Sequence, residues 1–186
     1  QTMHGSIYDK VHQFSQYYQG ESKAMKSKLL MVFILVAILA VPFAATANAQ
    51  GNANLAEVRA ATAQFHRSEV AEAAGYFNPG ECVEVPGVGG MGYHFVNFGL
   101  VDLEINPTQP EILVYAPSPS GNMRLVAVEY AVPIEPWDAI YDYPPSVLGQ
   151  EMNLTPHLGL YTLHVWIWQN NPYGMFADFN PDVSCN

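Results

Sequence analysis

Hydrophobic and polar positions follow two different periods along the chain, and the period changes near Gly75. Before this point, core-facing positions recur every three or four residues, a spacing typical of an amphipathic helix. The recurring positions are Leu55, Val58, Thr62 and Phe65. Asn54 can cap the start of this helix and Gly75 its end. The pattern therefore predicts one helix of about five turns over residues 54–75.

Beyond Gly75 the pattern alternates every second residue, which is typical of strands. The segments rich in β-branched and aromatic residues are 93–102, 111–117, 124–133 and 161–169. A short loop separates residues 112–116 from residues 123–132, which predicts a β-hairpin. Residues 134–160, rich in proline and aromatic residues, predict a long ordered loop. We expect one α+β domain, with the helix packed on a mainly antiparallel curved sheet or partial barrel.

Strand alternation also assigns side chains to faces. The core-facing set of the last strand is Tyr161, Leu163, Val165 and Ile167, and the opposite set is Thr162, His164, Trp166 and Trp168. Glu129 lies on an otherwise apolar face of strand 124–133, where a carboxylate must be paired, protonated or bound to a ligand. Strand 93–102 contributes His94. Each of three strands thus offers one candidate metal ligand.

His94, Glu129 and His164 therefore form a candidate metal site. Two imidazoles and one carboxylate suit a divalent metal such as zinc, or iron in a facial triad. Two other interpretations fit the same residues: a metal-free acid–base pair in an enzyme, and a hydrogen-bonded His–Glu pair that is purely structural. The chain has no short spacing motif such as H-x-H or H-E-x-x-H that would select among them.

A second constellation is aromatic and joins residues 134–160 to the last strand. Its candidate ligand-binding members are Trp137, Tyr141, Trp166 and Trp168. Trp and Tyr carry an apolar ring and a polar tip, and beside acidic residues they are the usual lining of a sugar-binding cleft. The alternative is ordinary core and loop packing. A small molecule or a glycan is therefore the partner that these residues predict.

Residues 25–49 have the three parts of a secretory signal peptide. Lys26 and Lys28 give a positive start, an apolar run covers 29–40, and Ala47-Asn48-Ala49 forms a cleavage site. Residues 1–24 lack hydrophobic periodicity, and we interpret them as a leader outside the native protein. The expected organisation is a leader (1–24), a signal peptide (25–49) and one secreted domain (50–186).

The domain at residues 50–186 is strongly acidic. The first 49 residues hold four of the 7 basic and two of the 17 acidic side chains, so 3 basic and 15 acidic ones remain. The basic residues are Arg59, Arg67 and Arg124. Such a surface repels phosphate groups, which argues against binding to nucleic acid and, after cleavage of the signal peptide, to anionic membranes.

Cys82 and Cys185 are the two cysteines of the chain. In an exported protein an even pair predicts a disulfide. This bond would close a loop of about 100 residues and would tie the C-terminal end to the segment after the helix.

The spacing of Gly87, Gly89 and Gly92 matches the letters of a dinucleotide-binding fingerprint. That fingerprint requires a helix directly after the glycines. The strand-like residues Tyr93, His94 and Phe95 follow instead, so we interpret the match as chance.

Several stretches together resemble a group of small exported bacterial proteins. They are "ATAQFHRSEVAEAAGY", "MGYHFVN", "PEILVYAP", "RLVAVEYAVP" and "LHVWIWQNNPYGMFADFNPDVSC". The resemblance covers about residues 58–186 and is most specific at the C-terminal segment. It implies a location outside the cell or in the cell envelope, and it implies no activity, cofactor or site residue. We expect a secreted binding protein with a metal site, a small exported metal-dependent or acid–base enzyme, or an aromatic carbohydrate-binding module.

Overall fold

The computed structural model describes residues 50–118 and 120–185. The leader expected at 1–24 and the signal peptide expected at 25–49 lie outside these residues. The described residues combine helices with a curled antiparallel sheet. None of the helices within them is long and apolar enough to span a membrane.

The segment predicted as one helix is divided into three pieces. They are α2 (Gln50–Thr62), the 3-10 helix η1 (Ala63–His66) and α3 (Ser68–Ala73). The Oγ1 atom of Thr62 donates a hydrogen bond to the carbonyl oxygen of Val58 at 2.7 Å, and such bonds bend helices. Arg67 then takes an extended conformation, with φ −97° and ψ 118°. The uninterrupted helix expected over residues 54–75 is therefore not observed, although Val58, Thr62 and Phe65 are buried as its pattern predicts.

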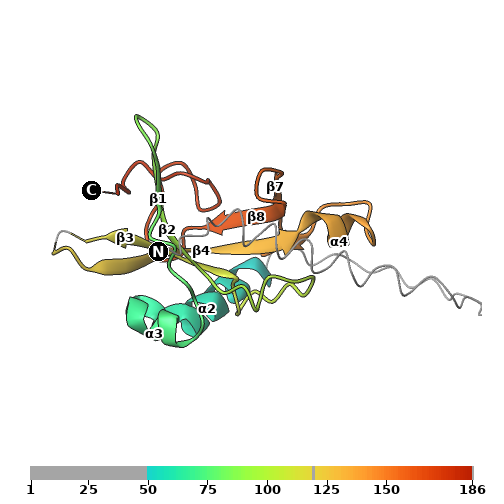
Figure 1. The fold of residues 1–186 in the computed structure, drawn as a ribbon, viewed down its shortest axis with the longest axis horizontal. Coiled ribbons are helices and arrows are strands. Elements are labelled where there is room, and N and C mark those ends of the chain that lie inside the picture. The colour runs from blue at the N-terminus through green and yellow to red at the C-terminus, as the bar shows by residue number, and fades with distance from the viewer. Residues whose placement is uncertain (1–49, 119, 186) are drawn as a thin grey trace, which may run out of the picture. The chain divides into compact units, whose positions relative to one another are not determined.

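The main sheet contains six strands in the order β1-β2-β3-β4-β8-β7. Their bounds are β1 Cys82–Val85, β2 Gly89–Val96, β3 Ile112–Pro117, β4 Met123–Pro133, β8 Leu160–Val165 and β7 Asn153–Thr155. Every neighbouring pair is antiparallel. The sheet curls into a half-barrel. In Figure 1, β1 and β2 run steeply across the direction of β3, β4 and β8. The predicted curved antiparallel sheet and the hairpin, which is β3 with β4, are confirmed.

Residues 134–160 contain more regular structure than the predicted loop. They form the helix α4 (Ile134–Asp138), the strands β5 (Ser146–Val147) and β6 (Gln150–Glu151), and the edge strand β7. Leu148 and Gly149 link β5 to β6 with positive φ angles of 55° and 76°, which suits a two-residue hairpin turn. These strands are two or three residues long, too short for alternation to reveal them in a sequence.

The sheet is covered on both faces. Helices α2 and α3 lie on one face and the C-terminal segment crosses the other (Figure 1). The helix-side core includes Val58 and Phe65 from the helices and Leu163 and Val165 from β8. The opposite core is smaller and joins Ile112, Val114, Ala127 and Ala131 to Trp166 and Val183. We call the face of the sheet that the C-terminal segment covers the inner face.

Two glycines of β2 allow the C-terminal segment to approach the sheet backbone. The amide of Gly90 donates to the carbonyl oxygens of Asn180 and Val183, at 3.1 and 2.9 Å. A Cβ atom at Gly89 would lie 2.2 Å from the Asn180 oxygen. Of the fingerprint-like glycines, Gly89 thus serves close backbone packing. Strand β2 contains Gly89 and Gly92 and continues to Val96, so the helix that the fingerprint requires is absent here.

The predicted disulfide is confirmed. Cys82 and Cys185 are bonded across a sequence separation of 103 residues, with their Cα atoms 5.8 Å apart. The amide of Cys185 also donates to Oε2 of Glu84 at 2.8 Å. The end of the chain is therefore fixed to β1 by a covalent bond and a hydrogen bond.

Candidate functional site

The register of the sheet places His94, Glu129 and His164 on the inner face. Glu129 on β4 lies directly opposite His164 on β8. Glu129 also pairs with Ile112 on β3, whereas His94 on β2 pairs with Val114 of the same strand. Directly paired residues share a face of the sheet. All three predicted site residues therefore face the layer beneath the C-terminal segment.

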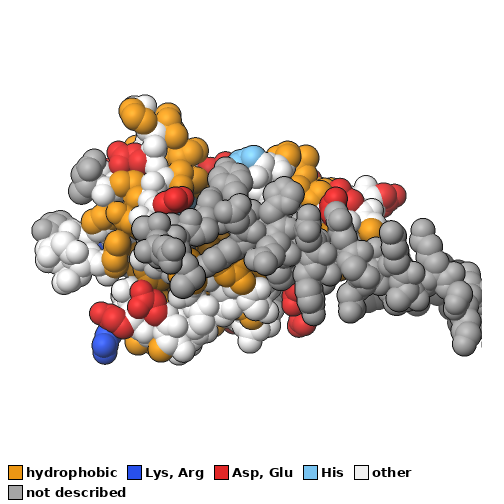
Figure 2. All heavy atoms as spheres, viewed as in Figure 1, with side chains coloured by type: hydrophobic (Ala, Val, Ile, Leu, Met, Phe, Trp, Pro, Cys, Tyr) orange, Lys and Arg blue, Asp and Glu red, His pale blue; other side chains and the backbone are white. Residues whose placement is uncertain are grey.

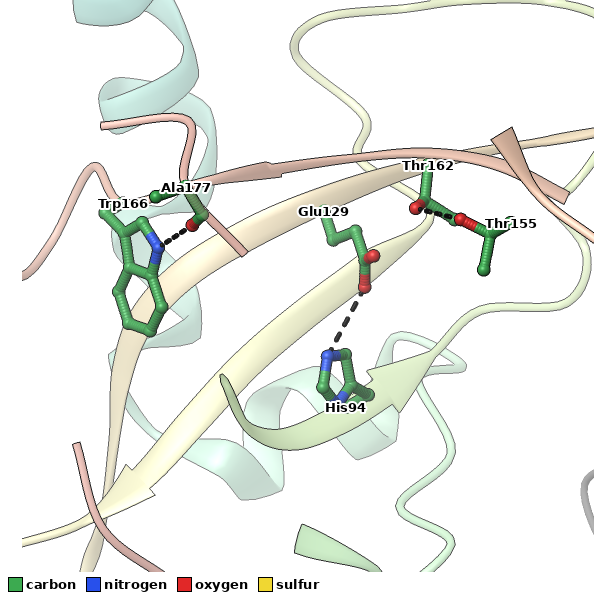
Figure 3. A network of polar contacts seen from close by, with 6 residues as sticks. All are labelled: His94, Glu129, Thr155, Thr162, Trp166 and Ala177. Carbon is green, nitrogen blue, oxygen red and sulfur yellow. Dashed lines mark hydrogen bonds and ion pairs between the residues drawn. The ribbon is translucent and has the colours of Figure 1, made fainter. Parts of the chain in front are cut away.

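The curl of the sheet brings His94 and Glu129 together across β3. The Nε2 atom of His94 is 3.4 Å from Oε2 of Glu129, and Figure 3 shows the two side chains pointing toward each other. Their side chains are 16% and 7% exposed. The ring centre of His164 lies 6.0 Å from that of His94. The side chains from the three strands thus form one polar cluster that is largely buried.

Burial sets the protonation of the His94–Glu129 pair. Burial lowers the pKa of His94 to about 4, although a hydrogen bond to the backbone of Gly92 opposes the shift. Burial, followed by the nearby charge of Asp178, raises the pKa of Glu129 to about 8. Both shifts favour the neutral form of the group over its charged form, and the two side chains remain in contact at 3.4 Å.

Glu129 has a second partner on its own face of the sheet. A hydrogen bond from Thr162 lowers the pKa of Glu129 and so offsets a part of the shift caused by burial. The hydroxyl of Thr162 is itself 3.0 Å from that of Thr155 on β7 (Figure 3). The carboxyl is thus oriented from the β8 side as well as from β2.

His164 is the least satisfied member of the cluster. The residue is 1% exposed, and neither Nδ1 nor Nε2 has a hydrogen-bond partner. Burial, and then the neighbouring His94, lowers the pKa of His164 well below its usual value. The ring instead packs against Trp166, with ring centres 4.6 Å apart. A buried polar group without a partner is rare in native proteins and calls for a water molecule, an ion or a functional role.

The donor atoms of this cluster match those of a transition-metal site. Two imidazoles and a carboxylate are the ligands that zinc and non-haem iron accept. Among residues 50–118 and 120–185, no three His, Cys, Asp or Glu side chains are already placed to hold a metal ion. A metal ion bound here would thus require the three side chains to move toward a common point.

The predicted aromatic constellation is divided among separate places. Trp137 and Tyr141 stack on each other with ring centres 4.3 Å apart. Trp166 is 3% exposed, and its indole donates to the carbonyl oxygen of Ala177 at 2.6 Å (Figure 3). Trp168 donates to Thr62 at 3.1 Å and belongs to the helix-side core. The structure therefore does not join these four residues into one surface.

The position of Trp168 corrects the predicted alternation of the last strand. Strand β8 ends at Val165, and the amide of Trp166 donates to the carbonyl oxygen of Met175 instead of a strand neighbour. The amide of Ile167 donates a hydrogen bond to the carbonyl oxygen of Val165 at 3.0 Å. This tight turn interrupts the two-residue period, so Trp166 and Trp168 lie on opposite faces.

Two residues near the cluster, Asp178 and Thr162, are not among the predicted site residues. Asp178 acts on Glu129 from the C-terminal segment, and nothing local distinguishes it from other loop aspartates. Thr162 shares the face of His164 by alternation, which is the signal that places it beside Glu129.

Comparisons of the chain with protein-family models, with curated proteins and with solved structures found no match.

Proposed function

We propose that the protein is an exported binding protein that holds one divalent transition-metal ion through His94, Glu129 and His164. The observation that carries this proposal is the buried imidazole of His164, both of whose nitrogens lack a hydrogen-bond partner. A metal ion would occupy one of these nitrogens and would remove the cost of leaving a buried polar atom unpaired.

The spacing of the other two side chains supports a shared ion. Ligands about 2.0–2.1 Å from a tetrahedral zinc ion lie about 3.3 Å from each other. The His94 Nε2 and Glu129 Oε2 atoms are 3.4 Å apart. Two imidazoles that bind one zinc ion through Nε2 have ring centres about 5–6 Å apart, and those of His94 and His164 are 6.0 Å apart.

A location outside the cytoplasm agrees with the covalent structure. The Cys82–Cys185 disulfide is a bond that persists in oxidising compartments and is rare in the cytosol. Residues 25–49 have the sequence pattern of a signal peptide, which would direct the chain to such a compartment. These observations support secretion or retention in the cell envelope.

Calorimetry with metal-stripped protein tests the proposal. Protein purified without nickel is treated with a chelator, dialysed and titrated separately with zinc chloride and, under anaerobic conditions, ferrous sulfate. We expect one ion per chain and at least about a tenfold loss of affinity in His164→Gln. His157→Gln is the matched control, because His157 is exposed and belongs to no part of the cluster. Absence of binding by the native protein, or equal affinity in both variants, would refute the metal site.

A second candidate function is a small exported acid–base enzyme that uses His94 and Glu129 without a metal ion. The observation in its favour is the buried contact between His94 Nε2 and Glu129 Oε2, which are 3.4 Å apart. Burial also raises the pKa of Glu129 to about 8, and a general acid works best near the ambient pH. Hydrolysis of nitrophenyl esters and glycosides in the presence of a chelator measures this activity. Turnover that disappears in Glu129→Gln but persists without metal would favour the enzyme over the metal-binding protein.

A further inference from the structure

The end of helix α4 and the turn after it carry an aromatic surface away from the candidate metal site. We call this surface the aromatic corner and define it as Trp137, Tyr141 and Tyr143. The ring centres of Trp137 and Tyr141 are 4.3 Å apart, and those of Tyr141 and Tyr143 are 5.5 Å apart. Tyr141 is 37% exposed and Tyr143 is 59% exposed. Large aromatic residues at such exposure are enriched in protein interaction sites.

Hydrogen bonds to Trp137 and Asp138 fix the position of the aromatic corner. Trp137 is 7% exposed, and its indole donates to the backbone carbonyl oxygen of Tyr143 at 2.8 Å. The hydroxyl of Tyr161 on β8 donates to Asp138 at 2.9 Å. The exposed rings of Tyr141 and Tyr143 therefore project from a fixed turn, and ordering them on binding costs little entropy.

The charge around the aromatic corner has one sign. Glu135, Asp138 and Asp142 lie in the same ten-residue stretch as the rings, and no Lys or Arg follows Arg124 in the chain. Figure 2 shows acidic and hydrophobic side chains together at the end of the domain where Figure 1 labels α4. A surface of ring faces and carboxylates attracts cations by two mechanisms, the ring quadrupole and the Coulomb interaction.

The geometry of the rings favours a cationic group over a sugar. A pyranose needs an open ring face, but Tyr141 covers the face of Trp137. The planes of Trp137 and Tyr141 are tilted by 38°, and those of Tyr141 and Tyr143 by 48°, so the rings do not form a flat platform. A planar guanidinium stacks on the face of a single ring and needs no flat platform of several rings.

We propose that the aromatic corner docks an arginine-rich segment of a partner protein. Guanidinium groups of that segment stack on Tyr141 and Tyr143 and pair with the carboxylates of Asp138 and Asp142. This interaction is independent of the metal site, because none of its residues belongs to the His94–Glu129–His164 cluster.

Fluorescence anisotropy with a labelled hexa-arginine peptide tests the docking. The comparison peptide contains citrulline at every position, which keeps the shape of arginine without its charge. At physiological salt we expect Tyr143→Leu to weaken binding of hexa-arginine about three- to fivefold and Tyr141→Leu/Tyr143→Leu to weaken it more than about tenfold. Asp142→Asn should weaken it as well, and the citrulline peptide should not bind.

Tyr173→Leu is the matched control, because Tyr173 is 60% exposed and lies outside the aromatic corner. It separates docking at this site from general attraction to an acidic protein. Equal binding by native protein, Tyr143→Leu and Tyr173→Leu would overturn the proposal. Binding of cellohexaose or chitohexaose that is lost in Tyr143→Leu would overturn it in favour of a glycan.

Discussion

Glu129 and His164 stand directly opposite each other on adjacent strands, yet His164 makes no hydrogen bond to the carboxyl. Glu129 reaches across β3 to His94 instead, at 3.4 Å. The sheet thus buries two imidazoles beside one carboxyl, and only the imidazole of His94 contacts that carboxyl. An arrangement selected for stability alone would place an apolar residue at 164, because an unpaired buried imidazole costs about 1–3 kcal/mol.

Replacing His164 with leucine should therefore stabilise the metal-free protein or leave it unchanged. The substitution removes two unsatisfied nitrogens and keeps a side chain of similar volume, so we expect the free energy of unfolding to stay the same or rise by about 1 kcal/mol. Urea denaturation in the presence of a chelator measures this change. Zinc, which should stabilise the native protein through mass action, should have no effect on His164→Leu.

His94→Leu is the matched comparison, and it should behave in the opposite way. It leaves the carboxyl of Glu129 buried without its imidazole partner, so we expect a loss of about 1–3 kcal/mol in the free energy of unfolding. Equal losses in both leucine variants would show that His164 has a partner in solution, and the case for its functional role would fail.

The stability of the metal-free protein should fall as the pH rises from about 6 to about 8, and Glu111 should contribute to this fall. Glu111 is 2% exposed, and burial raises its pKa to about 8. The folded protein therefore keeps a proton that the unfolded chain has lost, and the stability that this proton gives disappears as the pH approaches 8. Each such carboxyl contributes a slope of up to about 1.4 kcal/mol per pH unit.

Glu111→Gln tests this contribution, because glutamine keeps the shape of the side chain and cannot ionise. The variant should have a smaller loss of stability between pH 6 and pH 8 in urea denaturation experiments. Glu104→Gln, at an exposed position, should leave the slope unchanged. An unaltered slope in Glu111→Gln would mean that this carboxyl is already ionised in the folded protein.

The disulfide should account for a large share of the stability. Closing a loop with a sequence separation of 103 residues is worth about 4–5 kcal/mol in the chain-entropy model. We expect Cys82→Ser/Cys185→Ser to lower the free energy of unfolding by up to about this amount. Thermal and urea denaturation of the double variant, compared with native protein before and after reduction, measure the effect. A loss below about 1 kcal/mol would indicate that the ends stay together in the unfolded chain.

The sequence predicts the polar cluster because its signal is local. Alternation along a strand depends only on neighbouring residues, so it places His94, Glu129 and His164 on defined faces. The pairing of β2, β3, β4 and β8 then decides which of these residues meet. The hydrogen bonds of His164 depend on every element packed against it, and no pattern in the sequence reports them.

Two features cannot be predicted from the sequence because their causes are non-local. Strand β8 ends at Val165 because the amide of Trp166 bonds to Met175 in the C-terminal segment, and alternation cannot anticipate that contact. Glu111 begins a strand-like stretch and resembles an exposed end residue. Its side chain instead accepts a hydrogen bond from the amide of Ala131 at 3.0 Å, where β3 no longer supplies a backbone partner because it begins at Ile112.

Gly90→Ala should loosen the C-terminal segment that covers the candidate site. The added Cβ would lie 2.9 Å from both the Cγ1 and the carbonyl oxygen of Val183, so the segment must shift, at a cost of about 1–3 kcal/mol. We expect faster hydrogen exchange at the amides of Asn180 and Val183, because they belong to this contact. Gly99→Ala is the control, since its nearest contact is a side-chain atom at 3.3 Å. Unchanged exchange in Gly90→Ala would show that these glycines are not required for the close approach.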